Sequence, residues 1–440
     1  MGTRQRSRGI SLLCIADHRK VIQMSETILN NGLPVSYTPL PATHSFAIDL
    51  FARAGAIYED SGKEGITHFL EHLHFRRLYD MTQPELYYYM ESIGTTLRAV
   101  TYRDCLRFYL KIAPRHFEKA LAIFKNILLA DDWSDDDVSA ERKVVLNEIY
   151  SKYEYDISEL AGKNIFSKTP YERAVLGSEE SVSSITREDV LHYKRRVFNS
   201  GNLKLFISGP VSSAERRLVA NALGDIQLPS GERQQPQCRY ERFGNRAPDI
   251  VKVGHEGDFI EADISFDVPE HFAAEVPDLL NCILGEGVGS RLQRSVREQK
   301  CYTNEICSWL ECYEDVSVLH IRFVVYRARF EDTFASIIDV LKDMRSGISR
   351  EDLETSLPFF EDNRAFYLDS PEDTNFLHAF NSFVLSRDDR CSYSKIGEET
   401  LRKASAELFT PRNMCVTLSG ACRRITKKRI TQMCHALDSD

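Results

Sequence analysis

The chain has 440 residues, 42% of them hydrophobic, and a formal net charge of −9 at pH 7. This length predicts two domains of about 200 residues each. The acidic balance argues against a nucleic-acid partner, because phosphate binding needs clustered positive charge. No apolar run approaches the roughly 18 residues that span a membrane, so we expect no membrane partner either.

The cysteines and the N-terminal segment bear on the cellular compartment. The eleven cysteines are an odd number without a C-x-x-C pair, which fits small buried side chains in a reducing compartment better than disulfides or a thiolate zinc site. Residues 1–23 are rich in Arg, but their apolar stretch is short and is followed by Asp17, so export is not expected. We predict a cytoplasmic protein, with a mitochondrial or related organelle matrix as the alternative.

Apolar periodicity and turn residues predict alternating strands and helices through the first half of the chain. Gly94 is typical of the position just after a helix, and Asp135 to Asp137 favour the first turn of another. The predicted elements, in chain order, are strands at 32–37 and 44–53, helices at 62–76 and 83–93, strands at 95–101 and 106–112, helices at 115–130, from 134 onward and at 185–197, and a strand at 203–209.

Residues 226–248 are rich in Pro, Gln, Arg and Gly, which makes them the best candidate for a linker. They divide the chain into an N-terminal domain, 25–225, and a C-terminal domain, 249–440.

The second half contains a fainter copy of the first, which indicates an internal duplication. Residues 116–128 resemble 329–341, and a capped acidic helix start follows each segment, at Ser134 and at Ser349. Chance similarity between two amphipathic helices is the alternative. The second half has no His/Glu cluster in its sequence like that of the first, so we expect any chemistry to be one-sided.

The strongest chemical signal is the H-x-x-E-H pattern of His68, Glu71 and His72. Side chains four residues apart share a helix face, so both imidazoles can bind one ion while Glu71 lies beside it. Zinc suits such donors, and a catalytic zinc site keeps a position for water, whose proton a nearby carboxylate can accept. Glu71 is the predicted base, and His74 should face away from the metal. Solvated helical histidines are the alternative for the pentapeptide alone.

A third ligand is expected from the helix that begins at Ser134. Glu141 and Glu148 are seven residues apart and share one helix face, beside Val144 and Val145. Carboxylates next to a buried seam are costly unless they are paired or bound to metal. We predict Glu148 as the third zinc ligand and Glu141 as the carboxylate that fixes the geometry of the ligands.

These segments resemble the pitrilysin, insulinase and mitochondrial processing peptidase family of inverted-zincin metallopeptidases. Residues 65–73 are similar to that family's metal-binding helix, and residues 141–148 to the segment with its distal ligand. Further similar stretches lie at 54–60, 176–185 and 289–298, so the likeness runs over about residues 25–345.

The resemblance implies one Zn²⁺ per chain, held by His68, His72 and Glu148, with Glu71 as the base and Glu141 as the supporting carboxylate. It also implies an α+β fold of the α/β sandwich type. Two homologous domains, each a mostly antiparallel sheet packed with helices, would form half of a clamshell. Because two such halves enclose a chamber, we expect a homodimer or a heterodimer with a related chain.

The resemblance also implies substrate contacts. The family's edge strand that pairs with substrate usually reads Asn-Ala-x-Thr, and this chain has Arg98 and Ala99 at the first two positions. Backbone pairing should survive this change, but the pocket beside the metal becomes more positive. Arg291 and Tyr302 lie near the family's substrate-contacting Arg and Tyr. The chain is shorter by about two residues just before Tyr302, and a packing or salt-bridge role is the alternative for both side chains.

Together these patterns predict a zinc metalloendopeptidase that hydrolyses short or unfolded peptides bound as an added strand. One alternative is a non-catalytic subunit that serves an active partner. Another is a binding protein with a structural zinc, which would need a fourth protein ligand.

Overall fold

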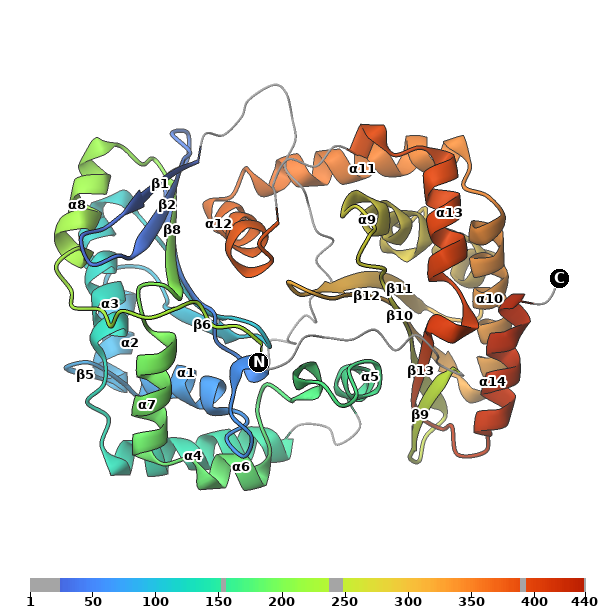
Figure 1. Cartoon of the computed structure of the whole chain (residues 1–440), viewed down its shortest axis with the longest axis horizontal. Coiled ribbons are helices and arrows are strands. Elements are labelled where there is room, and N and C mark those ends of the chain that lie inside the picture. Colours follow the sequence, from blue (N-terminus) through green and yellow to red (C-terminus); the bar gives the residue numbers. More distant parts are fainter. Residues whose placement is uncertain (1–23, 152–155, 237–247, 388–392, 439–440) are drawn as a thin grey trace.

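The computed structural model describes residues 24–151, 156–236, 248–387 and 393–438, and shows two β-sheets with their helices (Figure 1). Most helices cover the outer faces of the two sheets, while α5 and α12 lie between them. The basic segment 1–23 lies outside the described residues, as does part of the predicted linker, 237–247. Among the described residues, no helix is long and apolar enough to cross a membrane.

The first sheet has six strands in the order β1-β2-β8-β3-β7-β6. All neighbouring strands are antiparallel except β2 and β8, which run parallel. Its strands are β1 Ser25–Ile28, β2 Pro34–Pro39, β3 Phe46–Ala52, β6 Arg98–Thr101, β7 Leu106–Ile112 and β8 Leu203–Gly209. A short hairpin of β4 (Arg77–Leu78) and β5 (Met81–Thr82) stands apart from it.

The second sheet repeats this topology with five strands in the order β11-β12-β10-β13-β9. As β2 pairs parallel with β8 in the first sheet, β9 pairs parallel with β13 here, and the other pairs are antiparallel. Its strands are β9 Asp249–Gly254, β10 Phe259–Asp267, β11 Glu305–Cys312, β12 Ser317–Tyr326 and β13 Met414–Gly420. The shared topology explains the two similar amphipathic segments of the sequence, because each forms the helix after the antiparallel hairpin.

The helices divide between the two halves of the sequence. The first half contains α1 Ile66–Arg76, α2 Gln83–Ser92, α3 Phe117–Leu129, α4 Asp135–Ser151, α5 Ile157–Ile165, α6 Glu179–Ser184, α7 Arg187–Val197 and α8 Ser213–Leu223. The second contains α9 Glu275–Asn281, α10 Phe330–Ser346, α11 Arg350–Tyr367, α12 Pro371–Ala379, α13 Glu398–Leu408 and α14 Lys427–His435. The sequence pattern did not predict α5, α6 and α8 in the first half, or α9, α12, α13 and α14 in the second. The domain limits of 25–225 and 249–440 stay a proposal, because helices cross between the two sheets.

Two helices pack on the sheet formed by the other half of the sequence. Helix α12 packs on β3 and β8, and α5 packs on β10 and β13 (Figure 1). Asn375 of α12 donates hydrogen bonds to the Asp49 carboxylate (2.7 Å) and the Ala47 carbonyl (3.0 Å). Asn164 of α5 donates in the same way to the Thr417 hydroxyl (3.1 Å). Each sheet therefore satisfies buried polar groups with an asparagine from the other half.

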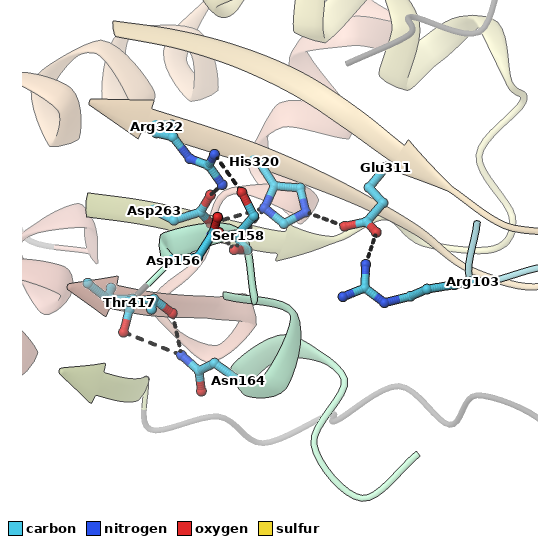
Figure 2. A network of polar contacts seen from close by, with 11 residues as sticks. Arg103, Asp156, Ser158, Asn164, Asp263, Glu311, His320, Arg322 and Thr417 are labelled. Carbon is cyan, nitrogen blue, oxygen red and sulfur yellow. Dashed lines mark hydrogen bonds and ion pairs between the residues drawn. The ribbon is translucent and has the colours of Figure 1, made fainter. Parts of the chain in front are cut away.

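A network of buried ion pairs joins the two halves of the protein beside α5 (Figure 2). His320 lies between two carboxylates, with Nδ1 3.0 Å from Asp263 and Nε2 3.2 Å from Glu311. Arg103, from the turn between β6 and β7, donates to Glu311 at 3.1 Å. Arg322 donates to Asp263 at 3.2 Å. Positive and negative groups alternate in this network, so each buried charge lies next to a charge of opposite sign.

The network fixes the charge state of His320. Burial of the imidazole opposes its protonation, but Asp263 and Glu311 outweigh burial and raise the pKa of His320 to about 9. Burial likewise opposes ionisation of Glu311, yet His320 and Arg103 lower its pKa to about 2. The imidazole is therefore a cation at neutral pH, and its charge stabilises the folded state.

The His320 ion pairs should make stability depend on pH. Because the folded pKa exceeds the unfolded value of about 6.5, the stabilisation is complete below pH 6.5 and is lost as the pH rises through 9. We expect the difference in unfolding free energy between wild type and His320→Gln to shrink by about 3 kcal/mol between pH 6 and pH 10. Urea unfolding of both proteins at each pH measures this difference in free energy. The exposed His192→Gln is the matched control, and a difference that stays constant with pH would contradict the prediction.

Candidate metal centre

Helix α1 presents His68, Glu71 and His72 from the face that packs against α4. The helix begins at Ile66 and not at residue 62 as the pattern predicted, because Gly65 has a left-handed backbone with φ +89°. A Cβ at Gly65 would lie 2.5 Å from the Leu176 carbonyl oxygen, so only glycine fits at this start.

A buried carboxylate caps this helix. Glu59 accepts hydrogen bonds from the backbone N–H groups of Gly65 (2.7 Å) and Thr67 (2.9 Å). Burial raises the pKa of Glu59 to about 7, while the hydrogen bonds from Thr67 and Gly65 and the charge of Arg173 oppose that rise. Glu59 therefore satisfies N–H groups that would otherwise be unpaired at the start of the helix.

Helix α4 supplies the carboxylates. Ser134 and Asp137 form reciprocal hydrogen bonds at its start, where the Ser134 hydroxyl accepts from the Asp137 N–H at 3.1 Å. Glu141 is buried and Glu148 is 42% exposed in its side chain. Because α4 packs along α1, Glu141 and Glu148, seven residues apart on α4, both reach His72.

The structure brings His68, His72 and Glu148 together as a group of possible metal ligands, with one donor atom of each within 4.8 Å of the others. Glu148 Oε2 lies 3.5 Å from His72 Nε2 and 3.8 Å from His68 Nε2. Tetrahedral zinc, with bonds of about 2.0 to 2.2 Å, places its ligand atoms roughly 3.4 Å apart. The three side chains therefore fit a zinc ion with small adjustments.

Glu141 holds His72 from the side opposite to this group. The His72 Nδ1–H donates to Glu141 Oε1 at 2.8 Å, which directs Nε2 toward Glu148. Burial of His72 opposes its protonation, but the hydrogen bonds to Glu141 and Glu148 outweigh it and raise its pKa to about 9. The carboxylates thus favour a positive charge at this place, which a metal cation would supply.

Glu71 is half-buried beside the two histidines, and its Oε2 accepts a hydrogen bond from the Thr101 hydroxyl at 2.5 Å. Burial raises the pKa of Glu71, and the charge of Glu148 adds to this, whereas Thr101 and His72 act in the opposite direction. A carboxylate in this setting has a higher affinity for a proton than an exposed glutamate, which suits a general base.

Strand β6 ends the first sheet beside the site. It pairs with β7 on one side, and among the described residues no strand pairs with its other edge. The Arg98 side chain is 61% exposed and lies 3.9 Å from Glu372 of α12. Ala99 packs on the core of the first sheet. The edge is therefore open to an added strand.

Arg291 and Tyr302 lie elsewhere. Arg291 forms ion pairs with Asp343 (2.9 Å) of α10 and Asp352 (2.6 Å) of α11, two helices far from α1 and α4 in Figure 1. Tyr302 packs on the core of the second sheet, with the Arg329 guanidinium over its ring. The structure does not bring either side chain to the histidines of the same chain. Their role as substrate contacts stays a prediction.

His74 is fully buried and faces the core, away from the ligand group. Its Nδ1 lies 2.7 Å from the Leu70 carbonyl and its ring stacks on Phe198. Burial lowers its pKa to about 3, and the nearby Lys194 adds to this effect. The expectation that His74 faces away is confirmed.

Two family models match the chain in succession. Residues 35–179 match the model described as Insulinase (Peptidase family M16), and residues 184–357 match the Peptidase M16 inactive domain. The chain belongs to the M16 peptidase family. The inactive-domain match covers much of the second half, in which the sequence shows no His/Glu cluster.

Several relatives of this M16 chain are named as zinc proteases. An uncharacterized zinc protease of Rickettsia bellii is 26% identical over 74% of this chain and 79% of its own length. The mitochondrial-processing peptidase subunit beta of Saccharomyces cerevisiae is 27% identical over 56% of this chain and 55% of its own. These names support a zinc protease family.

Solved structures show the same fold. A protease from Helicobacter pylori superposes with a TM-score of 0.82 at 20% identity, covering 91% of this chain and 100% of that one. A peptidase M16 inactive domain from Pseudomonas fluorescens gives a TM-score of 0.76 at 17% identity, covering 90% and 98%. The predicted fold, two α+β units of the half-clamshell type, is confirmed.

In the sequence of this M16 chain, no pattern assigns a role to Glu59 or Thr101. Glu59 lies within the stretch 54–60, whose similarity to the family gave a signal, and Thr101 lies in the Asn-Ala-x-Thr-like strand. Their roles became apparent only from hydrogen bonds to α1, which is distant from Thr101 in sequence.

Removal of the Glu59 cap should destabilise α1. Glu59→Ala leaves two buried N–H groups without their acceptor, so we expect a loss of about 2 to 3 kcal/mol in unfolding free energy, and a smaller loss for Glu59→Gln. Urea unfolding measures both. Glu64→Ala is the matched control, because Glu64 accepts from the Gly62 N–H at an exposed turn. Equal losses for Glu59→Ala and Glu64→Ala would show that the cap has no special role.

Proposed function

We propose that this chain is a zinc metalloendopeptidase that hydrolyses peptide bonds in short or unfolded peptides, within a chamber formed by two subunits. The observation that carries the proposal is the convergence of His68, His72 and Glu148 from two helices, with Glu71 directly beside them. Membership of a family whose relatives are named zinc proteases supports it.

The donor set favours a catalytic over a structural zinc. Structural zinc sites are closed by four protein ligands, whereas catalytic sites have three and leave room for water. Among the residues that the structure describes, the group of possible ligands has three members. The exposure of Glu148 gives solvent a way to the site from that side.

Each residue then has a distinct task. Zinc bound by His68, His72 and Glu148 would lower the pKa of water and polarise a peptide carbonyl. Glu71 would accept the proton of the attacking water and pass it to the departing amine. Glu141 would hold the His72 ring in the orientation and tautomer that offer Nε2 to the metal.

The substrate would bind as an extended strand along the free edge of β6, beside Arg98 and Ala99. Backbone pairing of this kind accepts many sequences but requires an unfolded segment, which accounts for the proposed preference for short or unfolded peptides. The second subunit would be a further copy of this chain or a related chain, as a relative named a subunit of a processing peptidase suggests.

A non-catalytic partner subunit is the second candidate, because the name of that relative indicates that processing peptidases are built from more than one subunit. Cleavage of unstructured peptides by the purified chain, together with its mass in solution, separates the candidates. Activity of the pure chain supports the enzyme, whereas activity only after addition of a related chain supports a heterodimer. If that mixture keeps its activity with Glu71→Gln in this chain, this chain is the non-catalytic subunit.

Glu71→Gln should abolish peptide cleavage and keep the metal. The amide cannot accept the proton of water, so we expect kcat to fall by about 100-fold or more. Zinc should stay at one ion per chain, because Glu71 is not a ligand in the proposal. Steady-state kinetics and metal analysis measure the two quantities, with the exposed Glu118→Gln on α3 as the matched control. A Glu71→Gln chain that cleaves peptides at the wild-type rate would refute the role of the base.

Glu141→Gln should weaken zinc binding. Loss of the charged acceptor for His72 Nδ1 should raise the Kd for zinc by about 10- to 100-fold. Competition with a chromogenic chelator measures this Kd. An unchanged Kd would show that His72 does not depend on Glu141 for its orientation.

A further inference from the structure

Thr101 connects the catalytic base to the edge strand. It is the last residue of β6, is only 5% exposed, and donates its hydroxyl hydrogen to Glu71 Oε2 at 2.5 Å. Thr101 pairs with Leu106 of β7, so the sheet ladder fixes its backbone. A residue on a rigid strand therefore holds one oxygen of the Glu71 carboxylate.

The hydrogen bond restricts a side chain that has several free torsions. A glutamate on a helix surface can adopt many rotamers, and each rotation moves the carboxylate relative to the neighbouring histidines. With Oε2 held by the Thr101 hydroxyl, rotation of the Glu71 carboxylate is restricted. A general base works only within hydrogen-bond reach of the proton that it accepts, so this restriction affects the chemical step.

We propose that Thr101 is a positioning residue: its hydroxyl holds the Glu71 carboxylate at a fixed position relative to β6, the strand that receives the substrate. This inference rests on the proposed peptidase function. A peptide paired with β6 takes its position from the β6 backbone, and Glu71 takes its position from the last side chain of the same strand. Strand β6 would thus position both the base and the peptide bond to be cleaved.

A similar contact in the second half of the chain shows that a hydroxyl on an end strand can also have a purely structural role. There the Ser308 hydroxyl on β11, again the end strand of its sheet, donates to Asn281 Oδ1 of α9 at 2.6 Å. Asn281 cannot act as a base at neutral pH, so this contact only ties a helix to a strand. The experiment must therefore separate an effect on catalysis from an effect on stability.

The test compares Thr101→Val, which has the same shape without the hydroxyl, with Thr101→Ser, which keeps the hydroxyl. The control is Thr95→Val, because Thr95 precedes the same strand and donates to the Lys111 carbonyl at an exposed place. Steady-state kinetics on an unstructured peptide give kcat and KM separately. Metal analysis, thermal unfolding and crystal structures of the zinc-bound chains complete the set.

For Thr101→Val we expect kcat to fall by roughly 10- to 100-fold, a part of the effect of a general base, with KM changed by less than about 2-fold. Zinc should stay at one ion per chain, and the Glu71 carboxylate should be rotated in the crystal structure. Thr101→Ser should restore kcat to within about 3-fold of the wild type. Thr95→Val should leave kcat unchanged.

Different results overturn different claims. An active wild type with an unchanged kcat in Thr101→Val refutes the positioning role but leaves the peptidase function standing. A Thr101→Val chain that loses zinc or melts early, yet keeps its kcat per bound zinc, assigns Thr101 a structural role only. Equal losses in Thr101→Ser and Thr101→Val remove the hydroxyl from the explanation. A zinc-loaded wild type that cleaves no peptide, alone or with a related chain, refutes the peptidase function and the inference with it.

Discussion

The packing of α1 against α4 is the constraint on which the site depends. It places two imidazoles and two carboxylates from separate helices within a few ångströms, in a partly buried place where unpaired negative charge is costly. The raised pKa of His72 shows how strongly these carboxylates favour a positive charge. The Glu59 cap and the close approach of Gly65 to Leu176 fix the start of α1. They thereby fix the position of the two histidines along α4.

The two halves show how one fold serves different tasks. Helix α9 follows β10 as α1 follows β3. Its residues Asp278 and Asn281, with Cys282 directly after it, have the spacing of the H-x-x-E-H residues. Burial raises the pKa of both Asp278 and Cys282, so neither offers a ready anion to a metal. Among the described residues, the group of possible ligands lies in the first half alone. Side-chain chemistry, and not topology, therefore distinguishes the halves.

Helices α5 and α12 join the two halves, because each packs on the sheet of the other half. Each helix covers polar groups on the sheet of the other half, and the buried charges around His320 connect residues of both halves (Figure 2). Because α5 follows closely after α4 in sequence, the second sheet supports the part of the chain that continues from the helix with Glu148. The half without a ligand group thus contributes to the framework of the half that has one.

The sequence by itself determined the local elements and the donor types. Helical spacing placed His68 and His72 on one face of their helix and Glu141 and Glu148 on one face of another helix. The pattern also located the strands of the first sheet, except β1, to within a few residues. These features depend on neighbours in the chain, which a sequence displays directly. The tertiary structure decided which faces meet: the contact of Thr101 with Glu71, the Glu59 cap, the exchange of α5 and α12, and the ion pairs of Arg291. Those contacts join residues distant in sequence, and their free energy comes from burial and pairing that arise only when separate elements pack.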